Sequence, residues 1–176
     1  YNFWVKNILI IGYKSFLSKN FVERFNHKFK FFFYKKYFKK DDKNFSTHLE
    51  KIIKKKKINL ILNFAANNDN SLKHGDFEKI LESNFYLPLS LIKIASKYKI
   101  MLFLFLSKDM KKDHKFKNFY SLSKEMLRVY INNEIINSNL RIIDIDSLYG
   151  PYDLNKKRIF PSLFNKLYNN KNLKVN

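Results

Sequence analysis

The chain is poor in several residue types whose absence narrows what it can be. Its 176 residues contain no Cys, three Gly, three Pro and one Trp. Without cysteine, a disulfide framework and a thiolate metal site are excluded. No apolar run approaches the ~18 uninterrupted residues that span a bilayer, and no signal peptide is visible. We therefore expect a cytoplasmic protein with no membrane partner.

Histidine is also scarce. The four histidines, His27, His48, His74 and His114, show no mutual spacing of the kind that metal ligands require. Each adjoins a predicted loop or a solvated helix face. We predict no metal site.

Negative charge is scarce as well, since 15 acidic residues face 35 Lys and Arg, for a net charge of +20. Lysines interleaved with aromatics, in 54–57 and 28–40, could bind phosphate and stack bases. The lysines also have an explanation that involves no nucleic acid. Abundant Lys, Asn, Phe, Tyr and Ile are what an AT-rich genome encodes on any fold, and 54–57 falls at a predicted helix C-terminus, which favours cations. We expect no specific nucleic-acid partner, although the charge should attract polyanions.

Apolar runs of strand length alternate along the chain with amphipathic stretches of helix length. Strands that are apolar throughout, separated by helices, indicate a parallel sheet covered on both faces. The predicted fold is therefore α/β, a doubly wound parallel sheet. The expected strands are 5–11, 29–34, 60–64, 101–106 and 140–145, and the expected helices are 16–25, 45–57, 77–98 and 119–136.

In such a sheet the ligand binds beyond the carboxyl ends of the strands. The first strand ends at Gly12, and Ser15 and Ser18 follow at the spacing of a dinucleotide-binding turn. Such a turn requires a small residue at each of three positions. The first allows a tight bend, the second lets the backbone approach the pyrophosphate, and the third lets the helix pack closely on the strand. Helix N-terminal amides would complete the anion site.

A second motif combines a phenol, an amine and a hydroxyl. Tyr120 precedes Lys124 by four residues, so a helix places both on one face, and Ser107 ends an apolar strand thirteen residues before Tyr120. The neighbouring ammonium should lower the pKa of the Tyr120 phenol towards a value useful for proton transfer. Ser107 could then hydrogen-bond the substrate oxygen. The alternative is an exposed helix Tyr beside a surface Lys.

With these motifs in order, the chain resembles the extended short-chain dehydrogenase/reductase superfamily, in its NAD(P)-dependent epimerase/dehydratase branch acting on nucleotide sugars. The segments that carry the resemblance cover nearly the whole chain. They are Ile8–Ser18, Asn63–Ala66, Asn84–Leu89, Phe105–Ser107, Tyr120–Lys124 and Leu148–Pro151.

The resemblance implies a Rossmann-type NAD(P)-binding domain and hydride transfer through a bound nicotinamide. Tyr120 would be the general acid/base, Lys124 would tune it and hold the nicotinamide ribose, and Ser107 would orient the substrate oxygen. For Asn84, a cofactor role competes with bonding at a helix bend caused by Pro88. The expected cofactor-binding residues are Gly12, Ser15, Phe16, Leu17, Lys35, Lys36, Asp42, Ala65, Ala66, Asn84, Tyr120 and Lys124.

Two departures from the family pattern favour an alternative. Ser15 and Ser18 replace two turn glycines, and the segment 108–119 is shorter than usual. A catalytically silent dinucleotide-binding module, acting as a sensor or scaffold, is therefore a second hypothesis. A polyanion binder is the third.

The end of the second strand bears on the choice of cofactor. An acid there would bind the 2′-hydroxyl of NAD, whereas a base would suit the 2′-phosphate of NADP. Lys35 and Lys36 follow Tyr34 directly, with Asp42 later as an adenine-side or loop residue. The pattern leans towards NADP.

The length suits one domain. We expect 1–150 to form the NAD(P)-binding domain and 151–176 to begin a truncated or reduced substrate-binding lobe, so that the chain is either a fragment or a reduced form. Family resemblance suggests a homodimer through the two long helices, 77–98 and 119–136. Which nucleotide sugar is bound lies outside these residues.

Overall fold

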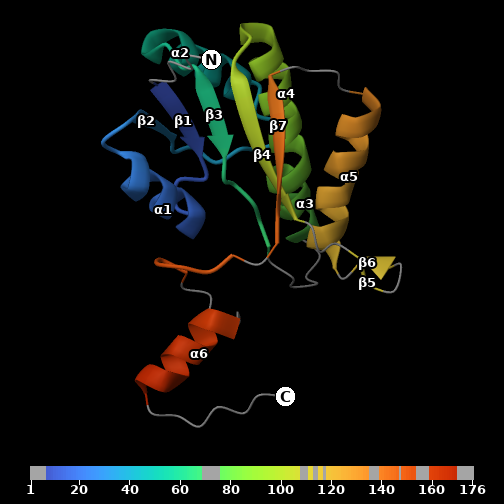
Figure 1. Cartoon of the computed structure of the whole chain (residues 1–176). Helices are drawn as coiled ribbons and strands as arrows, with labels where there is room; N and C mark the ends of the chain where they lie inside the picture. The colour runs from blue at the N-terminus through green and yellow to red at the C-terminus, as the bar shows by residue number, and fades with distance from the viewer. Residues whose placement is uncertain are drawn as a thin grey trace.

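A five-stranded parallel sheet organises the chain, with helices packed on both of its faces (Figure 1). The computed structural model describes residues 7–68, 76–107, 111–112, 115–116, 118–134, 139–146, 148–153 and 159–169. The predicted doubly wound α/β fold is confirmed. The strands of the sheet are β1 (Asn7–Ile11), β2 (Lys30–Tyr34), β3 (Leu60–Asn63), β4 (Met101–Ser107) and β7 (Leu140–Ile145).

The strands follow the order β2-β1-β3-β4-β7. Because all four pairings are parallel, every strand ends at the same edge, and Ile11 pairs with both Tyr34 and Asn63 there. The chain first turns from β1 to β2 and later crosses to β3 on the other side of β1. A ligand crevice is expected at that reversal, between the ends of β1 and β3.

The helices complete two apolar cores, one on each face of the sheet. Alternate residues of β1 point to opposite faces, so Leu9 and Ile11 join one core while Ile8 and Ile10 join the other. The first core packs under α2 (Asn44–Lys56), α4 (Leu87–Tyr98) and α5 (Phe119–Glu134), and the second under α1 (Phe16–Phe25).

The predicted helix 77–98 is helical along its length but contains a π-helical turn. It consists of α3 (Asp76–Leu81), the turn η1 (Glu82–Tyr86) and α4. Pro88 explains the turn, because it has no N–H to offer the carbonyl of Asn84. The Leu87 N–H instead reaches back to the carbonyl of Glu82. Such turns widen a helix locally and occur frequently at functional sites.

The hairpin before α5 lies outside the predicted pattern, and one helix lies beyond the edge of the sheet. The segment before α5 contains a hairpin of β5 (Lys111–Lys112) and β6 (Lys115–Phe116), which are too short and too rich in lysine to show alternation. Helix α6 (Ile159–Tyr168) lies beyond the carboxyl edge of the sheet rather than on a face (Figure 1).

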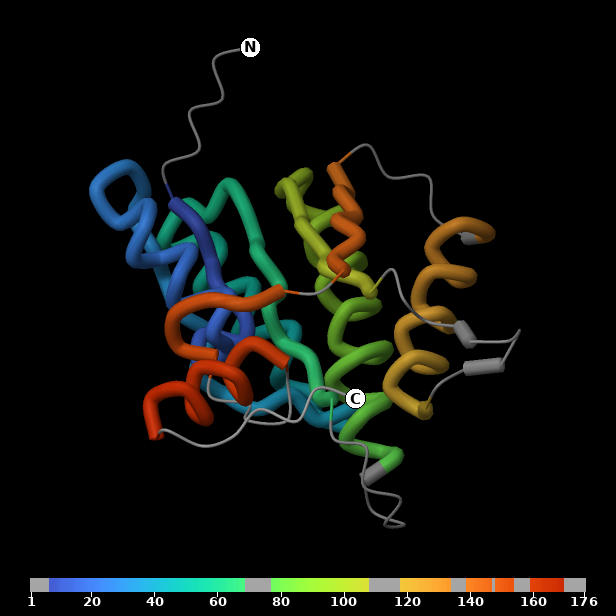
Figure 2. Tube along the Cα trace, turned by 60° about the horizontal axis from the view of Figure 1, so that its bottom comes forward, coloured from blue at the N-terminus to red at the C-terminus, as the bar shows by residue number. Residues whose placement is uncertain are grey.

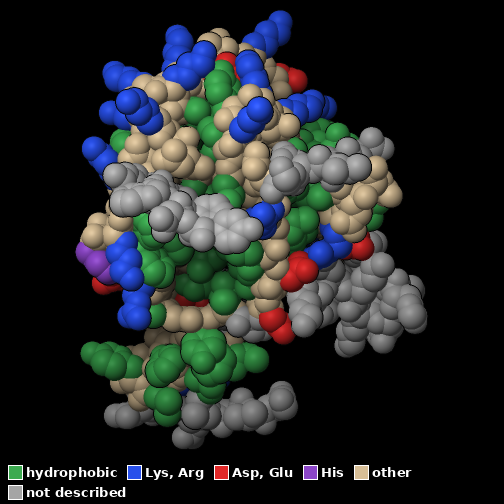
Figure 3. All heavy atoms as spheres, turned by 45° about the horizontal axis from the view of Figure 1, so that its top comes forward, with side chains coloured by type: hydrophobic (Ala, Val, Ile, Leu, Met, Phe, Trp, Pro, Cys, Tyr) green, Lys and Arg blue, Asp and Glu red, His purple; other side chains and the backbone are tan. Residues whose placement is uncertain are grey.

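Lysines gather at the opposite, amino-terminal edge of the sheet, where α2 ends in Lys54, Lys55 and Lys56 and Lys97 lies in the last turn of α4 (Figure 3). The side chains of Lys54 and Lys97 both approach the ring of Tyr98, at 5.7 and 5.4 Å from its centroid. Within the described ranges, no helix is both long enough and apolar enough to cross a bilayer.

The turn between β1 and α1 presses against the end of β3 at Gly12. Its φ is +78°, and a Cβ built there would lie 2.6 Å from both the Ala65 Cα and the Phe64 carbonyl carbon. No side chain fits without moving backbone. Gly12 is therefore required both for its conformation and for the approach of two loops.

We predict that Gly12→Ala lowers the free energy of unfolding by about 3 kcal/mol or more, because overpacking adds to the cost of a left-handed backbone. Gly150→Ala is the matched control, since Gly150 also has a positive φ but a Cβ at that position would meet no atom within 4 Å. It should cost only about 1–2 kcal/mol. Urea unfolding of both variants measures the difference, and equal losses would contradict the steric account.

Candidate functional site

Two adjoining cavities lie at the carboxyl edge of the sheet, on either side of the turn after β1. Their volumes are about 540 and 470 Å³. The first lies between the ends of β1 and β2 and the helical turns of α3 and η1, and the second lies between the ends of β3, β4 and β7 and helix α5. Both are lined by Lys14, Ser15, Phe64, Ala65 and Ala66.

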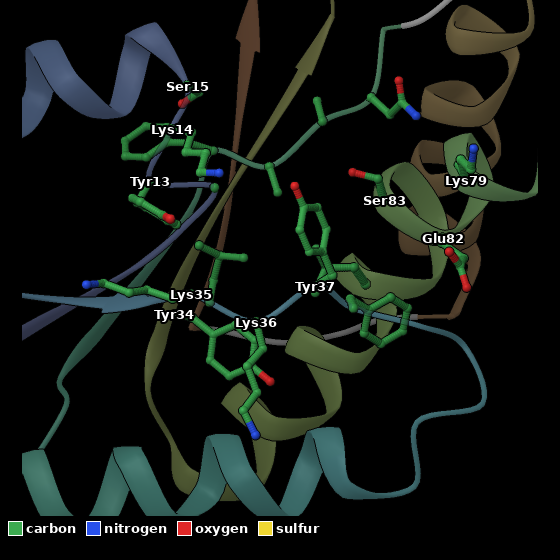
Figure 4. Close-up of a pocket in the computed structure, with 18 of the residues that line it drawn as sticks. Tyr13, Lys14, Ser15, Tyr34, Lys35, Lys36, Tyr37, Lys79, Glu82 and Ser83 are labelled. Atoms are coloured by element: carbon green, nitrogen blue, oxygen red, sulfur yellow. The ribbon is translucent and has the colours of Figure 1, made fainter. Parts of the chain in front are cut away.

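The first cavity is strongly basic. Lysines from three segments of the chain line it, namely Lys14, Lys35, Lys36 and Lys79, against one acid, Glu82. In Figure 4, Tyr37 projects towards the middle of this space and the side chains of Lys35 and Lys36 diverge from the end of β2. A phosphate-bearing ligand would be favoured here by charge.

The first turn of α1 is built for an anion, although serine replaces glycine. Ser15 is the N-cap, and its hydroxyl accepts a hydrogen bond of 3.1 Å from the Ser18 N–H. Ser15, which stands where the family has a turn glycine, thus acts as a helix cap. Its hydroxyl satisfies one of the N–H groups that a helix start leaves without intrahelical partners. Ser18 is fully buried, and its hydroxyl has no hydrogen-bond partner among the described residues.

A dinucleotide fits these features. Gly12 leaves a cradle that no Cβ could share, α1 presents its N-terminus to the same place, and cavities extend to both sides. An adenosine half and a nicotinamide half joined by a pyrophosphate have this shape.

The second cavity brings together the phenol, the amine and the hydroxyl that the sequence singled out. Ser107 at the end of β4 and Tyr120 and Lys124 in the first two turns of α5 all line it. Phe16 and Leu17 from α1 line the same cavity. Tyr120 is half-buried rather than directed into bulk solvent.

Lys124 is almost completely buried, with 3% of its surface exposed. Its ammonium donates a hydrogen bond of 3.2 Å to the carbonyl oxygen of Phe105 and lies 6.0 Å from the centroid of the Tyr120 ring. Burial lowers the pKa of the Lys124 amine from 10.5 to about 8. The amine is therefore held at a cost in stability, beside the phenol, with few partners of its own.

A buried asparagine ties α5 to the loop after β3. The side-chain carbonyl of Asn84 accepts from the Asn67 N–H at 2.9 Å, and its amide donates to the Asn67 carbonyl at 2.9 Å and to the Ser123 hydroxyl at 3.0 Å. That hydroxyl in turn donates to the Tyr120 carbonyl at 2.7 Å. The π-turn thus fixes the backbone that carries Tyr120 relative to the cavity wall.

The structure brings together most of the predicted site residues but not all of them. Asp42 lines neither cavity, and its carboxylate accepts a hydrogen bond of 2.9 Å from the Asn44 N–H, where α2 begins. Asn84 is fully buried in its network and also lines neither cavity. The remainder line one cavity or both: Gly12, Ser15, Phe16, Leu17, Lys35, Lys36, Ala65, Ala66, Ser107, Tyr120 and Lys124.

Two residues of the cavity wall, Tyr152 and Asp153, follow the Leu148–Pro151 segment and were not among the predicted site residues. This segment passes across the edge towards α1 (Figure 2), where Asn20 donates to the Pro151 carbonyl at 2.7 Å. Tyr152 and Asp153 thereby line the second cavity. A hydrogen bond to Glu23 raises the pKa of the exposed Tyr152 phenol. A local sequence pattern cannot predict a contact between residues as far apart in the chain as Asn20 and Pro151.

Tyr34, at the end of β2, lines the first cavity in the position where an acid would bind a ribose hydroxyl. Burial, with a smaller contribution from Asp42, raises the pKa of its phenol. The hydroxyl has no hydrogen-bond partner within the part of the chain that the structure describes. In the same residues, no group of three His, Asp or Glu side chains could hold a metal ion.

Comparisons with known proteins agree with this geometry. The model of the family described as "NAD dependent epimerase/dehydratase family" matches residues 8–176. A search of the curated proteins finds no matching sequence.

Solved structures match the fold at low sequence identity. A dTDP-4-dehydrorhamnose reductase from Bacillus anthracis, in complex with NADP, has a TM-score of 0.75 and 14% identity over 98% of this chain and 63% of its own. A dTDP-glucose 4,6-dehydratase from the same organism, in complex with NAD, has a TM-score of 0.72 and 17% identity over 96% and 63%. UDP-glucose 4-epimerase from Thermotoga maritima, with UDP-glucose, has a TM-score of 0.75 and 13% identity over 96% and 65%. The chain thus spans less than two thirds of the length of each.

We predict that Lys124→Met stabilises the protein without ligand, because it removes a buried charge. The gain at pH 7 should be on the order of 1–3 kcal/mol, bounded by the lowering of the pKa from 10.5 to about 8. The folded wild-type protein loses this proton above pH 8 and the unfolded chain only near 10.5, so the wild-type penalty is complete below pH 8 and fades as the pH rises.

Urea unfolding of the wild type and the variant from pH 7 to 10.5 measures this difference. The exposed Lys93→Met is the control, with an expected change within about 0.5 kcal/mol. A loss of stability in Lys124→Met, or a difference that does not change with pH, would count against a desolvated amine.

Proposed function

The chain belongs to the NAD dependent epimerase/dehydratase family, and we propose that it binds a nicotinamide dinucleotide and uses it to transform a nucleotide sugar. The reaction would be an epimerisation, dehydration or reduction, in which proton transfer accompanies hydride transfer. A single observation carries the proposal: the cavity lined by Ser107, Tyr120 and Lys124 adjoins the Gly12 turn.

The chemistry of each site residue suggests its role in binding the cofactor. The amides at the start of α1 would bind the pyrophosphate, and Ser15 would keep that helix start in place. The Lys124 ammonium, which is buried and donates to one carbonyl at 3.2 Å, would donate further hydrogen bonds to ribose hydroxyls. The bound nicotinamide would supply or accept the hydride.

Proton transfer would be left to Tyr120 and Ser107. The phenol oxygen of Tyr120 would give or take the proton on the sugar oxygen at the reacting carbon, and the Ser107 hydroxyl would hold that oxygen by a hydrogen bond. General acid–base catalysis of this kind contributes typically about 10²–10⁴-fold. The Asn84 network supports the arrangement, since it anchors the Tyr120 backbone.

NADP is the cofactor we favour. The last residue of β2 is Tyr34 rather than an acid, and Asp42 is used at the start of α2. The first cavity is lined by Lys35 and Lys36 instead, which suit a 2′-phosphate.

Recognition of the sugar would require more than the described site. Five exposed apolar residues lie on α6, and none of its described residues is buried (Figure 3). We propose that residues 151–176 begin a substrate-binding lobe, as the sequence predicted, following the NAD(P)-binding domain at 1–150. The exposed side chains are Ile159, Phe160, Phe164, Leu167 and Tyr168.

A silent dinucleotide-binding module remains the second candidate, although the Ser15 cap removes part of its support, because this serine serves the turn. The third candidate, a polyanion binder, has the lysine-rich edge in its favour. A cytoplasmic location and a homodimer stay predictions.

We predict that Tyr120→Phe loses turnover by about 10²-fold or more, because it removes the proton-transferring oxygen, while the NADPH dissociation constant changes less than about twofold. NADPH oxidation with dTDP-4-dehydrorhamnose and NAD-dependent conversion of UDP-glucose provide the assays. Tyr130→Phe, on the same helix but outside both cavities, is the control. Unchanged turnover in Tyr120→Phe would contradict the catalytic assignment.

We predict that replacing Lys35 and Lys36 together by alanine weakens NADPH binding by about 10–100-fold and leaves NADH binding within about twofold, because only NADPH carries the phosphate that these charges attract. Replacing Lys55 and Lys56 at the far edge removes the same charge and serves as the control. Fluorescence titration of both dinucleotides measures the effect. Equal weakening of NADPH and NADH would contradict the assignment.

A further inference from the structure

Beyond the predicted trio, a third long side chain of α5 reaches the edge of the sheet. Arg128 follows Lys124 by four residues and Tyr120 by eight, so the three lie along one side of the helix. None of the sequence motifs includes Arg128, and it lines neither cavity.

The guanidinium of Arg128 joins three elements. One nitrogen donates to one carboxylate oxygen of Asp144 on β7 at 3.1 Å, and a second nitrogen donates to the other carboxylate oxygen. That second nitrogen also donates to the Ser107 carbonyl at 3.4 Å. The remaining nitrogen lies 3.4 Å from Glu125, one turn back on α5.

These contacts meet where β4 ends. Asp144 pairs with Leu106 in the β4–β7 ladder, and Ser107 is the last residue of β4. Arg128 therefore connects the helix of Tyr120 and Lys124 to the strand end that presents the Ser107 hydroxyl. A bidentate Arg–carboxylate pair fixes direction as well as distance, which a lysine could not do.

We propose that Arg128, held by Asp144, is a positioning residue that sets the distance between the Ser107 hydroxyl and the Tyr120 phenol. The inference rests on the proposed function. It gives α5 two anchors, the contact with Asn84 near its start and that of Arg128 with β4 further along.

The exposure of the Arg128–Asp144 pair distinguishes a positioning role from a purely structural one. The side chain of Asp144 is 43% exposed and that of Arg128 23% exposed, so the ion pair should contribute little to stability. Catalysis is far more sensitive, since a misplacement of about 1 Å can cost on the order of 10²-fold in rate. Loss of the pair should therefore reduce turnover in a protein that remains folded.

The test uses Arg128→Lys, Asp144→Asn and the double variant in the full chain. We expect kcat in the two turnover assays to fall about 10–100-fold in each single variant, with KM and the NADPH dissociation constant within about twofold. The double variant should lose no more than the worse single variant, because both changes break one unit. Glu125→Gln is the control, since Glu125 contacts Arg128 from the same helix. Losses below twofold, independent losses that multiply, or losses that follow the melting temperature would overturn the proposal.

A second readout needs no substrate. Anhydride labelling of the Lys124 amine across pH, followed by mass spectrometry, should give a midpoint near the pKa of about 8 in the wild type. In Arg128→Lys the loosened helix should admit water and raise that midpoint by roughly one pH unit, whereas Glu125→Gln should not. If the wild type converts no nucleotide sugar, the proposed function has failed, and an unchanged labelling midpoint in Arg128→Lys then overturns the positioning role as well.

Discussion

The burial of one ammonium group, that of Lys124, is the constraint on which the site depends. Lys124 is 3% exposed and its amine donates to a single carbonyl at 3.2 Å, which disfavours the charged form, so the fold must hold it by other means. Leu127 and Ile131 do this, because they follow on the same helix and pack into the core of the sheet. A chain gains nothing in stability from such an amine. A ligand in the second cavity would explain this position by accepting hydrogen bonds from the Lys124 ammonium.

The remaining features arrange space around that amine. Parallel pairing puts every strand end at one edge, and the Gly12 turn lies so close to Ala65 that cavities open on both sides of it. Basic side chains line one cavity, while the phenol, amine and hydroxyl line the other. One elongated anionic ligand with a reactive end would satisfy both, and family membership gives this ligand a chemical class.

Much of this could be predicted from local pattern, because buried parallel strands are continuous apolar runs and small residues mark tight turns. Ser107, Tyr120 and Lys124 were found by spacing, since helix periodicity and the shared strand edge determine their meeting. Asp42 could be assigned from the sequence only as an adenine-side or loop residue, because a carboxylate in a loop can bind a helix start, as it does at Asn44, as readily as a ligand. The Arg128–Asp144 pair depends on the register between β4 and β7, and the position of Tyr152 in the cavity wall depends on a contact with α1. Neither contact can be predicted from a local sequence pattern.

A crystal structure of the full chain with NADPH bound would test the central claim most directly. The account predicts the pyrophosphate against the turn from Gly12 to Leu17 and a hydroxyl of the nicotinamide ribose within hydrogen-bond distance of the Lys124 amine. A dinucleotide bound elsewhere, or one whose nicotinamide lies outside the cavity of Ser107 and Tyr120, would contradict it.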